Sequence, residues 1–162
     1  MWQSISELAE SFSDEDWKTV TECPGWTVQD QVVHIIGIER TLLGDPTPEV
    51  DLPSDLPHVK NDVGAMNEAW IESRRGHSGA EVLAEFREVT AERLRRVSAM
   101  SDDELGAPTP SPVGEVPYRD FLAVRVFDSW IHEQDIRRAL GRPGGWDTPA
   151  MPRAGGAKRA RR

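Results

Sequence analysis

The chain has 162 residues, 38% of them hydrophobic, which suits a single domain built around one core. Its one cysteine excludes an intramolecular disulfide and a cysteine-rich zinc site. No apolar run approaches the roughly 20 residues that span a bilayer, and the first residues lack the basic start and apolar stretch of a secretion signal. We therefore expect a cytoplasmic protein without a membrane segment.

The formal net charge of −9 is unevenly distributed along the chain. Residues 151–162 contain five basic residues and no acidic one, which leaves residues 1–150 with a charge of −14. A body this acidic repels nucleic acid and anionic lipid, so neither is expected as a partner. Because residues 151–162 lack the side chains that build a core, we expect a folded domain over 1–150 and a disordered basic tail over 151–162.

The first part of the chain predicts two helices. Apolar residues recur at helical intervals over residues 2–12, and an acidic run then ends that helix ahead of a loop up to residue 26. Thr27 followed by Asp30 is a capping-box pattern, and the helix that it begins should reach about Leu43. Four prolines then predict an ordered loop over residues 44–60.

Two further helices are predicted in the middle of the chain. Asn61 or Asp62 can cap a helix that ends near residue 76. Ser78 with Glu81 repeats the capping-box pattern and should begin a long helix that reaches about residue 100. The inward face of this long helix is expected to consist of Val82, Leu83, Phe86, Val89, Leu94 and Val97.

The last predicted helix follows a proline-rich loop over residues 101–117, which has room for one helical turn at its start. It should run from about Tyr118 to Leu140, with Gly141 as its stop. No segment shows convincing strand alternation. Five helices joined by loops pack most simply as an antiparallel bundle, so the expected fold class is all-α.

The most informative local pattern is the spacing of Asp128 and His132, which places both side chains on one face of a helix, close enough to bind one metal ion. His34 is the natural third ligand. Two histidines and one carboxylate leave a fourth position open, as in catalytic rather than structural zinc sites. The alternatives are a solvated helix face for Asp128 and His132, and a packed core histidine for His34.

Four other residues could take part in a functional site, and the sequence assigns a definite role to none of them. Asp135 can accept a hydrogen bond from a ligand histidine, or pair with Arg138 on the surface. Cys23 is more typical of a packed small residue than of a nucleophile, because no histidine lies near it in sequence. His58 and His77 lie in loops and receive no role.

Two stretches resemble one known family. The first is Glu22-Cys-Pro-Gly-Trp-Thr-Val-Gln-Asp with the following Val33-His34, and the second begins at Asp128-Ser-Trp-Ile-His and continues to Pro143. Their order and content resemble the mycothiol-dependent maleylpyruvate isomerase family of actinobacteria, in the DinB-like superfamily of metal-binding bundles. The resemblance covers about residues 5–150 and implies a four-helix bundle with an extra short helix and long loops.

The resemblance also implies a metal site and a chemistry. The family's divalent metal, usually zinc, would be held by His34, Asp128 and His132, although the isomerase has Glu where this chain has Asp128. The thiol cosubstrate would be mycothiol, whose metal-stabilised thiolate attacks a small electrophile, as in an isomerase or a thiol transferase. Arg125 is a candidate to orient the substrate, and no residue is assigned as catalytic.

A non-catalytic metal-binding or partner-binding bundle is the competing function. The isomerase carries a smaller C-terminal domain that contributes to activity, where this chain carries the basic tail. One hypothesis is that the tail is a truncated or out-of-frame terminus. The sequence leaves open whether the protein is a monomer or a homodimer.

Overall fold

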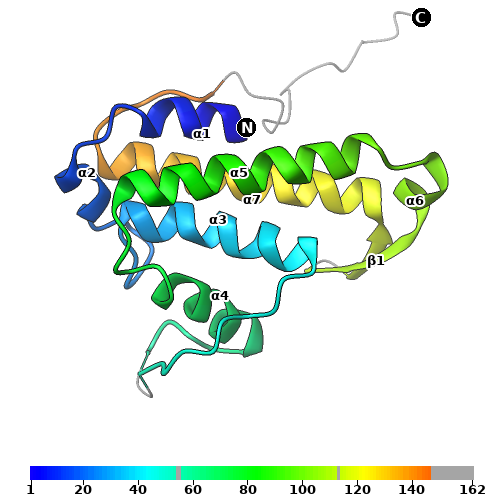
Figure 1. The fold of residues 1–162 in the computed structure, drawn as a ribbon, viewed down its shortest axis with the longest axis horizontal. Helices are drawn as coiled ribbons and strands as arrows, with labels where there is room; N and C mark the ends of the chain where they lie inside the picture. The colour runs from blue at the N-terminus through cyan, green and yellow to red at the C-terminus, as the bar shows by residue number, and fades with distance from the viewer. Residues whose placement is uncertain (54–55, 113, 147–162) are drawn as a thin grey trace, which may run out of the picture.

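The structure is a computed structural model, and it describes residues 1–53, 56–112 and 114–146. The predicted tail over 151–162 lies outside the described residues. Figure 1 shows a helical molecule with one small hairpin. In chain order the elements are α1 (Trp2–Ala9), α2 (Asp14–Lys18), α3 (Val28–Leu43), α4 (Asp62–Glu72), α5 (Gly79–Ser98), α6 (Asp102–Gly106), β1 (Pro108–Ser111), β2 (Gly114–Pro117) and α7 (Tyr118–Ala139).

Four helices, α1, α3, α5 and α7, form the bundle. Helix α3 packs against α5 and α7 on one side and against α4 on the other. Helix α1 lies on the side of α5 and α7 that is opposite to α3, as Figure 1 shows. Its Trp2 Nε1 donates to Ser129 Oγ of α7 at 3.1 Å. The expected all-α helical bundle is therefore confirmed.

Local capping explains where the two central helices begin. The Thr27 and Ser78 side chains accept hydrogen bonds from the backbone N–H groups of Asp30 and Glu81. In return, the Asp30 and Glu81 side chains accept from the backbone N–H groups of the two caps, so both predicted capping boxes are present. Residue 61 likewise caps α4. Helix α7 ends before Gly141, whose φ of +61° lies in the left-handed region that stops a helix at low cost.

The core lies where α3 meets α5 and α7. Close approach of α3 and α4 depends on Gly37, because a Cβ there would lie 2.6 Å from the Trp70 side chain. A substitution at Gly37 would push the two helices apart. The fully buried apolar side chains at the centre are Val28, Val32, Ile35, Ile36, Val82, Phe86, Val89 and Ile136.

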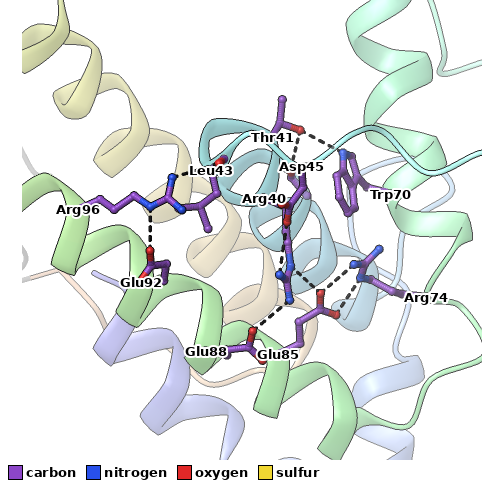
Figure 2. A network of polar contacts seen from close by, with 11 residues as sticks. Arg40, Thr41, Leu43, Asp45, Trp70, Arg74, Glu85, Glu88, Glu92 and Arg96 are labelled. Carbon is purple, nitrogen blue, oxygen red and sulfur yellow. Dashed lines mark hydrogen bonds and ion pairs between the residues drawn. The ribbon is translucent and has the colours of Figure 1, made fainter.

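A polar network joins α3, α4 and α5 at the side of the molecule (Figure 2). Glu85 of α5 accepts from Arg40 Nε of α3 at 3.0 Å and from Arg74 Nε, just beyond α4, at 2.8 Å. Burial would raise the pKa of Glu85, but the two guanidinium groups lower it overall. Trp70 of α4 adds a hydrogen bond from Nε1 to Thr41 Oγ1.

Four sequence predictions of structure are wrong in detail. The acidic run after α1 forms the short helix α2, because Ser13 caps it through a capping box with Asp16. Helix α4 ends at Glu72 rather than near Gly76. Leu94 is 56% exposed although it was expected to face inward.

The fourth error concerns strands, because residues 108–117 form a hairpin in which Pro108 pairs with Pro117 and Ser111 with Gly114. The prolines hide the alternation that would mark a strand, but a two-stranded ribbon tolerates them since each strand has a free edge. The predicted helical turn at the start of this loop is confirmed as α6. Within the described residues, no helix is long and apolar enough to cross a bilayer.

Candidate metal centre

Helices α3 and α7 bring three potential ligands together. His34 comes from the middle of α3, while Asp128 and His132 lie one turn apart on α7. One ligand atom from each of the three lies within 4.8 Å of the others. His34 Nε2 is 3.7 Å from Asp128 Oδ2, and His132 Nε2 is 3.7 Å from Asp128 Oδ1.

These spacings are too long for hydrogen bonds, which end near 3.2 Å for N–H···O. They are close to the separation of two ligands on one tetrahedral zinc ion, which is about 3.4 Å for bonds of about 2.1 Å. His34 Nδ1 is buried and has no hydrogen-bond partner among the described residues. The donor set, two imidazoles and one carboxylate, is one that zinc accepts. The residues present therefore fit a divalent metal ion.

The cluster is buried on one side and open on the other. His34 is only 6% exposed, whereas the Asp128 side chain is 32% exposed. Trp26 packs against both imidazoles, with ring centroids 5.1 Å from His34 and 6.1 Å from His132. An ion between the three ligands would thus be reached from the Asp128 side.

A chain of hydrogen bonds fixes the orientation of His132. Gln31 Oε1 of α3 contacts His132 Nδ1, and Gln31 Nε2 donates to Thr21 Oγ1 at 2.9 Å. Since the amide nitrogen is used by Thr21, the amide oxygen must face the histidine, which assigns the proton to Nδ1. The lone pair of Nε2 is then directed toward Asp128, as metal binding requires. Sequence reasoning missed Gln31, because its contact with His132 depends on how α3 and α7 are aligned.

The two charged residues predicted near the site differ in position, because Arg125 contacts the cluster through Asp128 and Asp135 does not. Arg125 is buried and donates from Nη1 to Asp128 Oδ2 at 2.8 Å and from Nε to Glu39 Oε1 at 3.0 Å. Asp135 pairs with Arg138. Of the two alternatives for Asp135, the structure shows the Arg138 pair, and the imidazole of His132 bonds to Gln31 instead.

The protonation states suit metal binding near neutral pH. Burial lowers the pKa of His34 from 6.5 to about 4, so this histidine is neutral. Burial alone would raise the pKa of Asp128, but the two histidines and Arg125 lower it far below its ordinary value. A neutral imidazole beside an ionised carboxylate is the form that binds a cation.

Cys23 lies in the loop before α3 and is partly buried against the core. Burial raises the pKa of its thiol, and the negative charges of Asp135 and Glu68 raise it further. Reactive cysteines have lowered pKa values, so Cys23 lacks the surroundings of an activated nucleophile.

Comparison with known proteins identifies the family. The family described as "Mycothiol maleylpyruvate isomerase N-terminal domain" matches residues 1–137. The chain belongs to this family. The resemblance found in the two sequence stretches is therefore confirmed over most of the chain.

Curated proteins and solved structures are also similar to this chain. Two uncharacterized proteins of Mycobacterium tuberculosis, from strains CDC 1551 and H37Rv, are each 27% identical over 139 residues, or 85% of this chain and 52% of theirs. The crystal structure of the mycothiol-dependent maleylpyruvate isomerase superposes with a TM-score of 0.61 at 16% identity, covering 83% of this chain and 55% of that one. A histidine-to-alanine mutant of the isomerase gives 0.56 at 15% identity, with the same coverage. The chain thus spans about half the length of the proteins it matches.

Proposed function

We propose that this protein binds one divalent metal ion, zinc, through His34, Asp128 and His132, and uses mycothiol to modify a small electrophile. The observation that carries the proposal is the open three-ligand cluster, whose histidine–carboxylate spacings of 3.7 Å match ligands of a shared ion better than hydrogen-bonded partners. Membership in a mycothiol isomerase family supports a low-molecular-weight thiol as cosubstrate.

A bound divalent ion with one open position would stabilise the thiol sulfur as the thiolate, which is the nucleophilic form at neutral pH. The protein's own residues prepare that position. Gln31 holds the His132 ring with its Nε2 directed inward, and Arg125 holds one oxygen of Asp128 while leaving Oδ1 facing His132. Trp26 covers the buried side of both imidazoles, which limits the approach of water to the Asp128 side.

The reaction type follows from what happens after thiolate addition. If the adduct expels the thiol again after bond rotation, the outcome is isomerisation, and if the thiol stays attached, the outcome is transfer. Both need only an activated thiol, a pocket and an orienting charge. The competing function is a metal-binding bundle without catalysis.

A thiol-conjugation assay separates the two functions. The zinc-loaded protein is mixed with mycothiol and monochlorobimane, and formation of the fluorescent conjugate is followed. We expect a rate above the uncatalysed rate for the wild type, a loss of that increment in His132→Ala, and no loss in His77→Ala, because His77 is exposed and is not one of the three clustered ligands. A wild type that holds zinc but shows no rate increment would favour the non-catalytic bundle.

A further inference from the structure

One face of α7 is apolar where it points away from the bundle. Phe127 is 48% exposed, and Ile131, one turn later, is 38% exposed. Between Asp120 and Arg138, the exposed residues of this helix are all uncharged, namely Ala123, Val126, Phe127 and Ile131. A long uncharged stretch on the surface of an acidic protein is typical of a face that contacts another molecule.

Two tryptophans extend the apolar surface beside Phe127. The Trp130 ring stacks against Phe127 with ring centroids 6.2 Å apart, and Trp146 meets Trp130 edge-on, also at 6.2 Å. Trp146 is 56% exposed. Contiguous aromatic and aliphatic side chains of this kind are typical of protein–protein interfaces, whereas scattered single ones are ordinary on any surface.

The residues on this face follow the heptad spacing of a coiled-coil helix. They recur at alternating steps of four and three residues and form one stripe, the α7 seam, which consists of Asp120, Val124, Phe127, Ile131, Gln134 and Arg138. Five of the six are exposed or half-buried, and Gln134 is covered where its Nε2 donates to the Gly144 carbonyl. The bundle uses the opposite face of α7, where Arg125, Ser129 and Ile136 are buried.

The α7 seam is complementary to itself when two copies of the helix run antiparallel. A two-fold axis at the level of Ser129 exchanges residues that are equally far from it in sequence. Phe127 of one copy then faces Ile131 of the other. Asp120 faces Arg138, because each lies nine residues from the axis. The centre of the seam is thus apolar, and both of its ends pair an acid with a base.

The end charges distinguish the antiparallel from the parallel arrangement. A parallel pair would bring Asp120 against Asp120 and Arg138 against Arg138, and like charges in contact are unfavourable. Within the chain, Arg138 pairs with Glu22 through Nε at 3.1 Å and with Asp135 through Nη2. Its side chain is 55% exposed, so its guanidinium group is accessible to a further carboxylate.

We propose that two copies of this chain associate through the α7 seam as an antiparallel helix pair. The dimer does not rest on the proposed catalysis, although Asp128 follows Phe127 and places the open side of the metal cluster next to the interface. An interface built from one helix face of each copy belongs to the small end of specific interfaces, so we expect a dissociation constant in the micromolar range.

Sedimentation velocity of the full chain, from about 1 to about 100 µM in about 0.15 M salt, tests the dimer. The wild type should pass from monomer to a species of twice the 18.1 kDa chain mass. Ile131→Glu, which buries an unpaired charge against the second copy's Phe127, should weaken dimerisation at least about tenfold. Val63→Glu, the same kind of change at a 60% exposed valine of α4, should leave dimerisation unchanged.

A charge exchange tests the orientation of the pair. Asp120→Arg should weaken dimerisation at least about fivefold, because arginine then faces arginine at both ends of the seam. Adding Arg138→Asp to that variant should restore the affinity to within about twofold of the wild type, since each end again joins opposite charges. A parallel pair would not be restored by the exchange, so a double variant that stays as weak as Asp120→Arg would overturn the antiparallel seam.

Because a metal ion shared between copies could also hold a dimer, the sedimentation is repeated with a chelator. A dimer that persists in the chelator and dissociates in Ile131→Glu supports the seam. A wild type that stays monomeric at the highest concentration, a dimer that Ile131→Glu leaves intact, or a dimer that the chelator dissociates would overturn the proposal. Circular dichroism of each variant confirms that it is folded.

Discussion

Trp26 contacts two histidine–carboxylate clusters, which differ in the distance between histidine and carboxylate. In the first, Glu68 accepts from Trp26 Nε1 at 3.1 Å, from Arg75 Nη2 at 2.9 Å, and pairs with His58 Nε2 at 3.0 Å. In the second, Asp128 stands 3.7 Å from each of two histidines. In the first, closed cluster the histidine and the carboxylate are hydrogen-bonded to each other, while in the second, open cluster the carboxylate and the two imidazoles stay beyond hydrogen-bond distance.

The difference in histidine–carboxylate distance indicates that one cluster stabilises the fold and the other can bind an ion. A buried carboxylate surrounded by donors at hydrogen-bond distance is satisfied and holds elements together, here the 44–60 loop, α4 and the loop before α3. Imidazole and carboxylate groups that converge without bonding leave room for an ion between them. The distinction cannot be read from residue type, because both clusters contain histidine and a carboxylate.

The largest effect on folding is expected at the closed cluster. Glu68→Ala removes the acceptor shared by Trp26, His58 and Arg75, and should lower the free energy of unfolding by about 3 kcal/mol. Glu72→Ala is the matched control, because Glu72 also pairs with Arg75 but its side chain is 39% exposed. It should cost no more than about 0.5 kcal/mol in urea denaturation. Equal costs for the two variants would show that the closed cluster does not stabilise the fold.

The open cluster should make the metal-free protein sensitive to acid. The pKa of His34 is about 4 in the folded protein and 6.5 as its ordinary value, so the unfolded chain binds more protons between these two pH values. The free energy of unfolding should therefore fall as pH drops from about 6.5 to about 4, by about 3 kcal/mol in total. Denaturation in the presence of a chelator measures this loss.

His34→Gln is the control for the acid sensitivity, because it removes the titrating ring. The same fall in His34→Gln as in the wild type would assign the effect to other groups. The contribution of Asp128 is separate, since its lowered pKa makes its stabilisation fade only below about pH 3.8.

A smaller effect is expected from the residue that orients His132. Gln31→Ala should weaken zinc binding about 10-fold to 100-fold, because His132 loses the acceptor that fixes its ring and tautomer. Gln29 lies two residues earlier on the same helix, and among the described residues its side chain bonds to backbone oxygens beyond α4. Gln29→Ala should therefore leave zinc affinity unchanged. Competition with a chromogenic chelator measures both. Unchanged affinity in Gln31→Ala would remove this glutamine from the site.

Local patterns were readable from the sequence, while long-range contacts were not. The Thr27 and Ser78 capping boxes are formed within a few residues, as is the one-turn spacing of Asp128 and His132, so the sequence alone indicates them. His34 was named as the third ligand from the sequence, but nothing local states that α3 packs beside α7, so its meeting with that pair stayed a prediction. Gln31 was missed for the same reason, since its role depends on how the two helices are aligned.

The exposed position of Leu94 was unpredictable for a related reason. The periodicity of α5 marks Leu94 as apolar, but its burial depends on whether a neighbouring helix covers it. Helix α1 comprises only Trp2–Ala9, and a cavity opens beside its first residues. The outcome was thus determined by the length of another helix, not by the sequence around Leu94.

Metal content, measured by inductively coupled plasma mass spectrometry on purified protein, tests the central claim most directly. The wild type should hold about one equivalent of divalent metal, and His34→Ala and His132→Ala should fall to background, because a three-ligand site rarely survives the loss of one ligand. His58→Ala, at the closed cluster, should retain the wild-type content. A wild type without metal, or a His34→Ala variant that keeps it, would contradict the account.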